Sequence, residues 1–151
     1  MKQIRSKVFE TNSSSSHSLT VAPAEVVDFS TFISKEQAQK GVLVVEFGEF
    51  GWEKDYHYDF TTKLSYLLMD IKCSTGSNDI SQTSQFAVVK DLLQEKLGVK
   101  LQVTGNGYID HQSVGTAVYL VNNKQELSDF LFGSNSYVET GNDNDYDYYD
   151  D

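Results

Sequence analysis

Cysteine is nearly absent from the 151-residue chain, because Cys73 is the only one. A single thiol cannot form an intrachain disulfide, and it cannot supply the several thiolates of a cysteine-rich zinc site. A chain of this length buries roughly two thirds of its unfolded surface, so it can fold without either crosslink. We therefore expect one domain in a reducing compartment, with no bound metal and no cofactor.

Long apolar runs are also missing. No stretch approaches the roughly 20 apolar residues of a membrane-spanning helix. The opening MKQIRSK carries positive charge, but no apolar segment of a signal peptide follows it. Both absences favour a cytoplasmic protein that does not contact a membrane.

Basic residues are scarce. The chain has 12 Lys and Arg against 22 Asp and Glu, a net charge of -10, and Arg5 is its only arginine. Proteins that bind DNA or RNA use clustered Lys and Arg to displace counterions, and arginine side chains to read bases. We therefore expect no direct binding of nucleic acid. An acidic chain is better suited to a protein partner with a basic surface.

Seven stretches have the alternation or the apolar content of β-strands: residues 3–9, 18–22, 42–47, 100–104, 107–111, 116–121 and 136–140. We expect the first two to pair as a hairpin across the serine-rich connection. The third, VLVVEF, is expected to be central in the sheet. The fourth and fifth flank Gly105-Asn106-Gly107, a sequence that favours a tight turn.

Four stretches are predicted to be helices. Ser34 and Gln37 have the spacing of a capping box at the start of a short helix. Three further helices are predicted from apolar residues on one face, and they begin after Asp59, near Phe86 and after Asn123.

The remaining connections, 47–59 and 73–84, have no period and are predicted to be loops. Together these elements predict a single α+β domain over residues 1–140. We expect a mixed or antiparallel sheet flanked by three or four helices, followed by an acidic tail at 141–151.

The tail, GNDNDYDYYDD, contains five aspartates and no basic residue, so without it the net charge would be -5 instead of -10. It can be interpreted as a solvated end, a calcium loop or a surface that imitates nucleic acid. Asp143, Asp145 and Asp147 match the opening of an EF-hand, but Tyr148 stands where that loop requires glycine. In the third interpretation, carboxylates replace phosphates and tyrosines stack where bases would lie.

An acidic stretch in the first half of the chain extends this candidate partner-binding surface. The residues predicted to contact a basic partner are Glu46, Glu49, Glu53, Asp55, Asp59, Asp143, Asp145, Asp147, Tyr148, Tyr149 and Asp150.

The segment VFETNSSSSHSLTV, residues 8–21, places four serines and His17 between two predicted strands. One interpretation is structural, because serine and asparagine side chains satisfy backbone groups in compact connections. A second is a polar site in which a hydroxyl is the nucleophile or ligand, a histidine the base and a carboxylate its partner. A third is a site of modification or of partner docking. The candidate catalytic residues are Ser13, Ser14, Ser15, Ser16, His17, Asp110, His111 and Asp143, with Glu139 as an alternative carboxylate.

The sequence carries no motif that fixes a reaction. Asp110 and His111 are adjacent, and adjacent side chains on a strand face opposite sides, so their proximity implies no catalytic pair. His57 lies among tyrosines and acids and is expected in a surface loop. There is no nucleophile elbow, P-loop or zinc-protease motif.

The opening F-E-T-N-S-S-S-S-H-S resembles that of a group of small uncharacterised proteins from bacteriophages and bacterial mobile elements. YIDHQS at 108–113 and ETGNDND at 139–145 also resemble the pattern of that group. The resemblance implies that three separate stretches form one site, with the residues Glu10, Asn12, Ser13, Ser14, Ser15, Ser16, His17, Asp110, His111, Asn142 and Asp143.

Two functional hypotheses follow from these observations. In the first, a phage-type acidic protein binds and inhibits a host protein with a basic surface, such as a nucleic-acid-binding defence factor or a polymerase. In the second, the chain is an enzyme or small-ligand binder that uses the serine run and its histidines. A third possibility, a virion or scaffold component, has no discriminating residue in the sequence. The charge balance and the phage resemblance favour the first, which needs no catalytic geometry.

Overall fold

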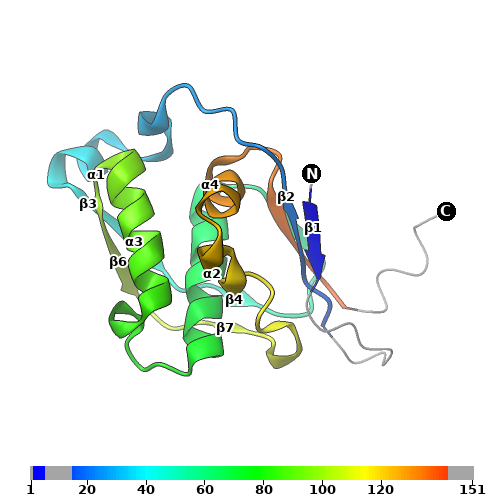
Figure 1. Ribbon diagram of the computed structural model, residues 1–151. Helices are drawn as coiled ribbons and strands as arrows, with labels where there is room; N and C mark the ends of the chain where they lie inside the picture. The colour runs from blue at the N-terminus through cyan, green and yellow to red at the C-terminus, as the bar shows by residue number, and fades with distance from the viewer. Residues whose placement is uncertain (1, 6–14, 143–151) are drawn as a thin grey trace.

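Strands and helices are interspersed along the chain in the computed structural model, which describes residues 2–5 and 15–142 (Figure 1). The strands are β1 Lys2–Arg5, β2 Ser18–Val21, β3 Val42–Glu46, β4 Glu49–Phe50, β5 Asp55–His57, β6 Lys100–Thr104, β7 Tyr108–Ile109 and β8 Tyr137–Thr140. The α-helices are α1 Lys35–Lys40, α2 Phe60–Thr75, α3 Ser84–Leu97 and α4 Lys124–Phe132. Short 3-10 helices occupy Phe29–Phe32, Ile80–Gln82, His111–Ser113 and Val118–Asn122. The α+β fold predicted from the sequence is confirmed.

One antiparallel sheet has the strand order β1-β2-β8-β5. The predicted hairpin is confirmed, since β1 pairs antiparallel with β2 and Lys2 lies opposite Val21. β8 then pairs antiparallel with both β2 and β5. Figure 1 shows this sheet beside α2 and α4, on the opposite side of the molecule from β3 and β6.

The other strands form two parallel pairs, β3 with β6 and β4 with β7. Backbone hydrogen bonds continue between the two pairs, because Phe47 N donates to Thr104 O (2.9 Å) and Tyr108 N donates to Gly48 O (3.1 Å). The segments 42–50 and 100–110 therefore run alongside each other as one interrupted parallel ribbon. Helices α2 and α3 make the crossover between them, as parallel neighbours require.

Glycine permits the close approach of the two segments at the interruption. A Cβ placed on Gly107 would lie 2.1 Å from Gly48 O and 2.8 Å from Gly48 C, closer than any real Cβ contact. Position 107 therefore excludes every side chain, and the sequence Gly105-Asn106-Gly107 serves this crossing. It does not close the antiparallel turn that the sequence suggested.

Two strand predictions and one loop prediction are corrected by this arrangement. Within the described residues β3 pairs only with β6, and Val44 is 50% exposed, so VLVVEF is not central. Residues 107–111 contribute the two-residue β7, which pairs with β4 and not with β6. The predicted loop 47–59 contains β4 and β5, which are too short to show an alternating pattern.

The predicted strand at 116–121 is also wrong, since a 3-10 helix spans Val118–Asn122. The buried carboxylate of Asp70 on α2 is the physical cause of this non-strand conformation. That carboxylate accepts hydrogen bonds from the N–H groups of Gly115, Ala117 and Val118 at 2.7 to 2.8 Å. These donors are thus unable to join a β-ladder.

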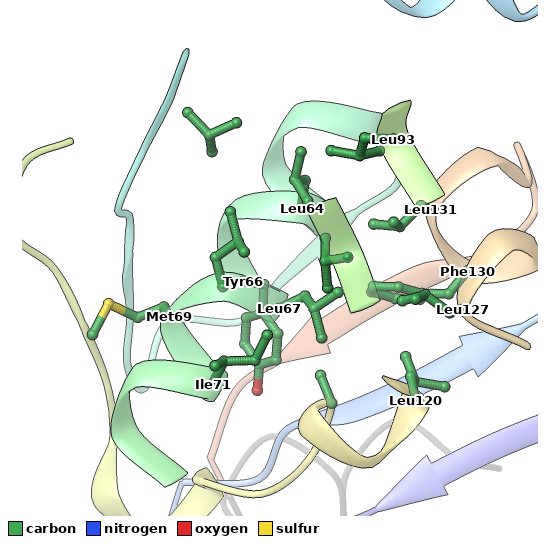
Figure 2. Packing of buried hydrophobic residues seen from close by; sticks show 14 of the residues in the cluster. Leu64, Tyr66, Leu67, Met69, Ile71, Leu93, Leu120, Leu127, Phe130 and Leu131 are labelled. Atoms are coloured by element: carbon green, nitrogen blue, oxygen red, sulfur yellow. The ribbon is translucent and has the colours of Figure 1, made fainter. Parts of the chain in front are cut away.

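The helix predictions are confirmed at their caps. Ser34 and Gln37 form the capping box of α1, the Asp59 side chain accepts from Thr62 N, and the Asn123 side chain accepts from Glu126 N. Helix α2 is the centre of the core, where its buried side chains contact those of α3 and α4 (Figure 2). None of the helices among the described residues has the length and apolarity to cross a membrane.

Lys63 is a charged side chain inside this core. Its Nζ donates to Gly133 O (2.8 Å) and Ser136 O (3.0 Å), so it ties α2 to the residues that follow α4. Burial lowers the pKa of Lys63 to about 8, against the opposing charge of Asp59. A neutral amine can still donate to both carbonyls, so either form of Lys63 can make this connection.

Gly107→Ala is expected to destabilise the fold by roughly 3 kcal/mol or more, because the methyl group overlaps backbone atoms that cannot move without breaking the ribbon. Gly98→Ala is the matched control. Gly98 has a φ of 68° and open space around it, so alanine should cost only about 1–2 kcal/mol there. Urea unfolding measures both variants, and equal losses would contradict the crossing.

Candidate functional site

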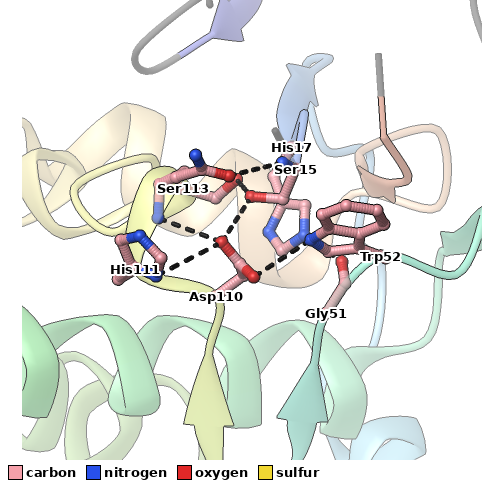
Figure 3. Close-up of polar contacts among 8 residues, drawn as sticks. Ser15, His17, Gly51, Trp52, Asp110, His111 and Ser113 are labelled. Atoms are coloured by element: carbon pink, nitrogen blue, oxygen red, sulfur yellow. Dashed lines mark hydrogen bonds and ion pairs between the residues drawn. The ribbon is translucent and has the colours of Figure 1, made fainter. Parts of the chain in front are cut away.

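The serine run ends in a buried polar cluster, of which Ser15 is the first described member. Its hydroxyl donates to Asp110 Oδ1 (3.0 Å) and lies 2.7 Å from the hydroxyl of Ser113 (Figure 3). The backbone N–H of Ser15 donates to Gln112 Oε1 (2.9 Å). Ser15 and Ser113 are 1% and 0% exposed, so neither hydroxyl faces bulk solvent.

His17 is fully buried, and both of its ring nitrogens are engaged. Nε2 lies 2.7 Å from the carbonyl oxygen of Gly51, and Nδ1 lies 2.9 Å from the Tyr66 hydroxyl. A carbonyl can only accept, so Nε2 carries the hydrogen. The Nδ1 of the neutral ring then accepts a hydrogen bond from the Tyr66 hydroxyl. Burial lowers the pKa of His17 and is opposed mainly by the Gly51 bond, while burial raises the pKa of Tyr66 well above its usual value. His17 thus connects β2 to α2 and to the end of β4.

Asp110 accepts hydrogen bonds from several groups on the exposed side of the cluster. Its Oδ2 accepts from the indole Nε1 of Trp52 (3.2 Å), and its Oδ1 accepts from Gln112 N (3.1 Å). His111 Nδ1 is 3.9 Å from Oδ1, beyond hydrogen-bond distance, and the His111 side chain is 88% exposed. Asp110 and His111 therefore form no hydrogen-bonded pair.

The C-terminal stretch completes the cluster. Ser15 and Asn142 form an antiparallel bridge, Ser16 N donates to Gly141 O (2.9 Å), and Asn142 Nδ2 donates to Trp52 O (3.2 Å). The three stretches grouped by the phage resemblance are therefore neighbours in space. Glu10, Asn12, Ser13, Ser14 and Asp143 lie outside the described residues.

The parallel ribbon determines where this cluster lies. Gly51 and Trp52 follow β4, and Asp110 follows β7, so the ends of two parallel neighbours present these groups together. Polar groups commonly gather outside the carboxyl ends of parallel strands. Asp70 fixes the adjoining loop through Gly115, and burial raises the pKa of this carboxyl against the pull of its N–H donors.

The cluster joins chain segments that are far apart in sequence through hydrogen bonds. A catalytic triad needs a histidine nitrogen that is hydrogen bonded to a serine hydroxyl. In residues 15–142 the ring of His17 bonds instead to Tyr66 and Gly51. Ser15 instead bonds directly to a carboxylate. The described part of the chain also contains no group of three or more His, Cys, Asp or Glu side chains arranged to hold a metal ion.

A second feature adjoins this cluster on the surface. A hollow of about 230 Å³ is lined by Glu49, Phe50, Gly51, Trp52, Glu53, Asp55, His57, Tyr108 and Thr140. Five of these side chains are exposed, and we call them the acidic–aromatic hollow: Glu49, Trp52, Glu53, Asp55 and Tyr108. Trp52 is 41% exposed and Tyr108 is 49% exposed.

Three of the predicted partner-binding carboxylates thus line one hollow. Glu46 and Asp59 are exposed but do not line it, and Asp59 caps α2 by accepting from Thr62 N. Asp143, Asp145, Asp147, Tyr148, Tyr149 and Asp150 lie outside the described residues. Glu139, the alternative carboxylate, lies on β8 opposite Ser18 and Tyr56 and is 9% exposed.

Sequence reasoning missed Trp52, Tyr66, Gln112 and Ser113. The YIDHQS stretch did contain the last two, and FGEFGW did place an aromatic ring among acids. Tyr66 carried no such signal, because it occupies an apolar face of α2 and its hydroxyl partner is distant in sequence.

Comparison with protein-family models, curated proteins and solved structures finds no match to the chain.

His17 should make the protein less stable in mild acid. Its pKa is lowered by folding, so between that value and 6.5 the unfolded chain binds more protons, and the free energy of unfolding falls as the pH drops below 6.5. In His17→Gln this dependence should be reduced, with a loss of about 2 kcal/mol at pH 7 from the two hydrogen bonds. Urea unfolding between pH 7 and 5 measures both effects, with the exposed His111→Gln as control. An unchanged pH dependence in His17→Gln would contradict this role.

Asp110→Ala should free the indole of Trp52, the only tryptophan of the chain. Local motion of Trp52 should become faster, since its Nε1 loses its described acceptor. Time-resolved fluorescence anisotropy measures this motion directly. Asp91→Ala, at an exposed position on α3, should leave it as in the native chain. Identical decays in all three proteins would show that Asp110 does not hold the ring.

Proposed function

We propose that the chain binds a basic surface of another protein through the acidic–aromatic hollow. One observation carries the proposal: Glu49, Glu53 and Asp55 line a single hollow together with the exposed rings of Trp52 and Tyr108. Tryptophan and tyrosine are among the side chains enriched at the energetic centres of protein interfaces. Beside three carboxylates, they suit lysine or arginine side chains of a partner.

Two forces would act on such a partner. The carboxylates attract an ammonium or guanidinium group, and the faces of the two rings add a cation–π contribution. Lys54 is the nearest competing cation in sequence, but its Nζ lies 5.9 Å from the ring of Tyr56, which does not line the hollow. The net charge of -10 would accelerate encounter with a basic surface.

The phage resemblance and the charge together support a more specific proposal. The chain acts in the cytoplasm of a bacterial host as an inhibitor of a protein that normally binds nucleic acid. Carboxylates occupy the positions of phosphates and aromatic rings those of bases, so the basic groove of the partner is blocked.

The alternative, an enzyme or small-ligand binder at the serine–histidine cluster, has less support. Ser15 and Ser113 are buried, and both nitrogens of His17 are occupied by structural partners. Ser15 donates directly to the Asp110 carboxylate, and in residues 15–142 the His17 nitrogens bond to other groups and not to this hydroxyl.

Capture from a bacterial host lysate tests the proposal, with native chain and two variants of equal charge. The hollow variant combines Glu49→Gln, Glu53→Gln and Asp55→Asn. The control removes three exposed carboxylates elsewhere: Glu25→Gln, Glu36→Gln and Asp91→Asn. At low salt the native and control chains should retain the same basic protein, which should dissociate at high salt.

The dissociation constant of the purified partner is then measured for the native chain and for both variants. The hollow variant should bind about 3- to 150-fold more weakly than the control, since three exposed charges each contribute about 0.2–1 kcal/mol. Equal weakening in both variants would mean that net charge alone acts. Equal retention by all three chains would remove the hollow from the function.

A further inference from the structure

Strand β6 presents a free edge on the side away from β3. Lys100 N donates to Gly41 O (2.8 Å), and Thr104 O accepts from Phe47 N (2.9 Å). Alternate residues of a parallel strand bond to a given neighbour, so the backbone groups of Lys100, Gln102 and Thr104 face β3. Those of Leu101 and Val103 point the other way. Within residues 15–142 no backbone or side-chain group is hydrogen bonded to them.

A groove of about 550 Å³ lies along this edge. Six consecutive residues, 101–106, line one side, and the connection between α2 and α3 at 78–81 lines the other. Successive strand residues point to opposite faces, so a hollow lined by 101–104 in succession follows the edge of the strand. Its apolar lining includes Ile80 and Phe86, each 5% exposed.

Among the residues that the structure describes, Lys72 is the only basic one that lines the groove. Its Nζ lies 5.6 Å from the centre of the Phe47 ring and 3.5 Å from Asn78 O, at the limit of a hydrogen bond. The neighbouring Asp79 carboxylate accepts from Ser81 N (3.0 Å) and Ser81 Oγ (2.6 Å). The ammonium of Lys72 therefore retains donors for an acceptor brought by a ligand.

We propose that this groove binds an extended peptide segment of another protein, which adds to β6 as a further strand. The N–H and C=O groups of Leu101 and Val103 pair with the peptide backbone, and alternate peptide side chains enter the apolar lining. A carboxylate of the peptide, from its last residue or from Asp or Glu, meets Lys72. A compact small molecule fits less well, because it would leave the row of backbone groups unpaired. The inference is independent of the acidic–aromatic hollow, with which the groove shares no lining residue.

The probe is the synthetic heptapeptide TVTVTVE with a free carboxyl terminus, titrated to millimolar concentration into the isotope-labelled full chain. Backbone pairing tolerates many sequences, so this alternating peptide should bind. NMR should show saturable shifts at Leu101 and Val103, and slower hydrogen exchange of their two amides. The same peptide N-methylated at every peptide bond keeps its side chains but cannot pair as a strand in either register, and it should produce neither effect.

Either of two results would overturn the proposal: no saturable shift at Leu101 and Val103, or equal shifts with the N-methylated peptide. The charge component has its own test in Lys72→Gln. This variant should bind the free-acid peptide about two- to fivefold more weakly, as for an exposed ion pair, and the amidated peptide as the native chain does. Lys90→Gln, at an exposed position outside the groove, is the matched control and should bind both peptides normally. Unchanged affinity in Lys72→Gln would refute the carboxylate at Lys72.

Discussion

The structure depends on the close approach of two chain segments at Gly48 and Gly107. Their backbones meet where a side chain on residue 107 would overlap the Gly48 carbonyl, and this contact aligns 42–50 with 100–110. The arrangement of the residues that follow β4 and β7 depends on this contact. Gly51 and Trp52 follow one segment and Asp110 follows the other. The hydrogen-bond partners of Ser15 and His17 therefore lie next to each other.

This geometry explains why a folded domain has a serine run next to its second strand. Ser15, Ser16 and His17 are all buried, and each of their described contacts joins segments far apart in sequence. Hydroxyls and an imidazole supply the donors and acceptors that a strand would take from a ladder. The same cluster also holds Trp52, which lines the acidic–aromatic hollow, so the buried hydrogen bonds position a side chain of the proposed binding surface.

Local signals in the sequence predicted much of the fold. Helix caps such as Ser34 and Asp59 depend on residues three positions apart, and the hairpin of β1 with β2 followed from alternation. Errors arose where distant partners decide. The carboxylate of Asp70 holds the backbone of 115–118 in a tight loop, although its sequence is typical of a strand. Gly107 permits a parallel crossing, although its neighbours favour a turn. In the site, the resemblance brought Ser15, His17, Asp110 and Asn142 together, whereas Tyr66 had no detectable signal because its hydroxyl partner is 49 residues away.

The hydrogen bonds of His17 to Gly51 and Tyr66 make it a neutral connector between chain segments. The most direct measurement is the NMR spectrum of the histidine ring nitrogens as a function of pH. We expect His17 to be the Nε2–H tautomer at pH 7, its ring hydrogen to exchange slowly, and the ring to remain neutral below pH 6.5. An Nδ1–H tautomer, or titration at or above pH 6.5 with a freely exchanging ring proton, would contradict it and return His17 to the candidate bases.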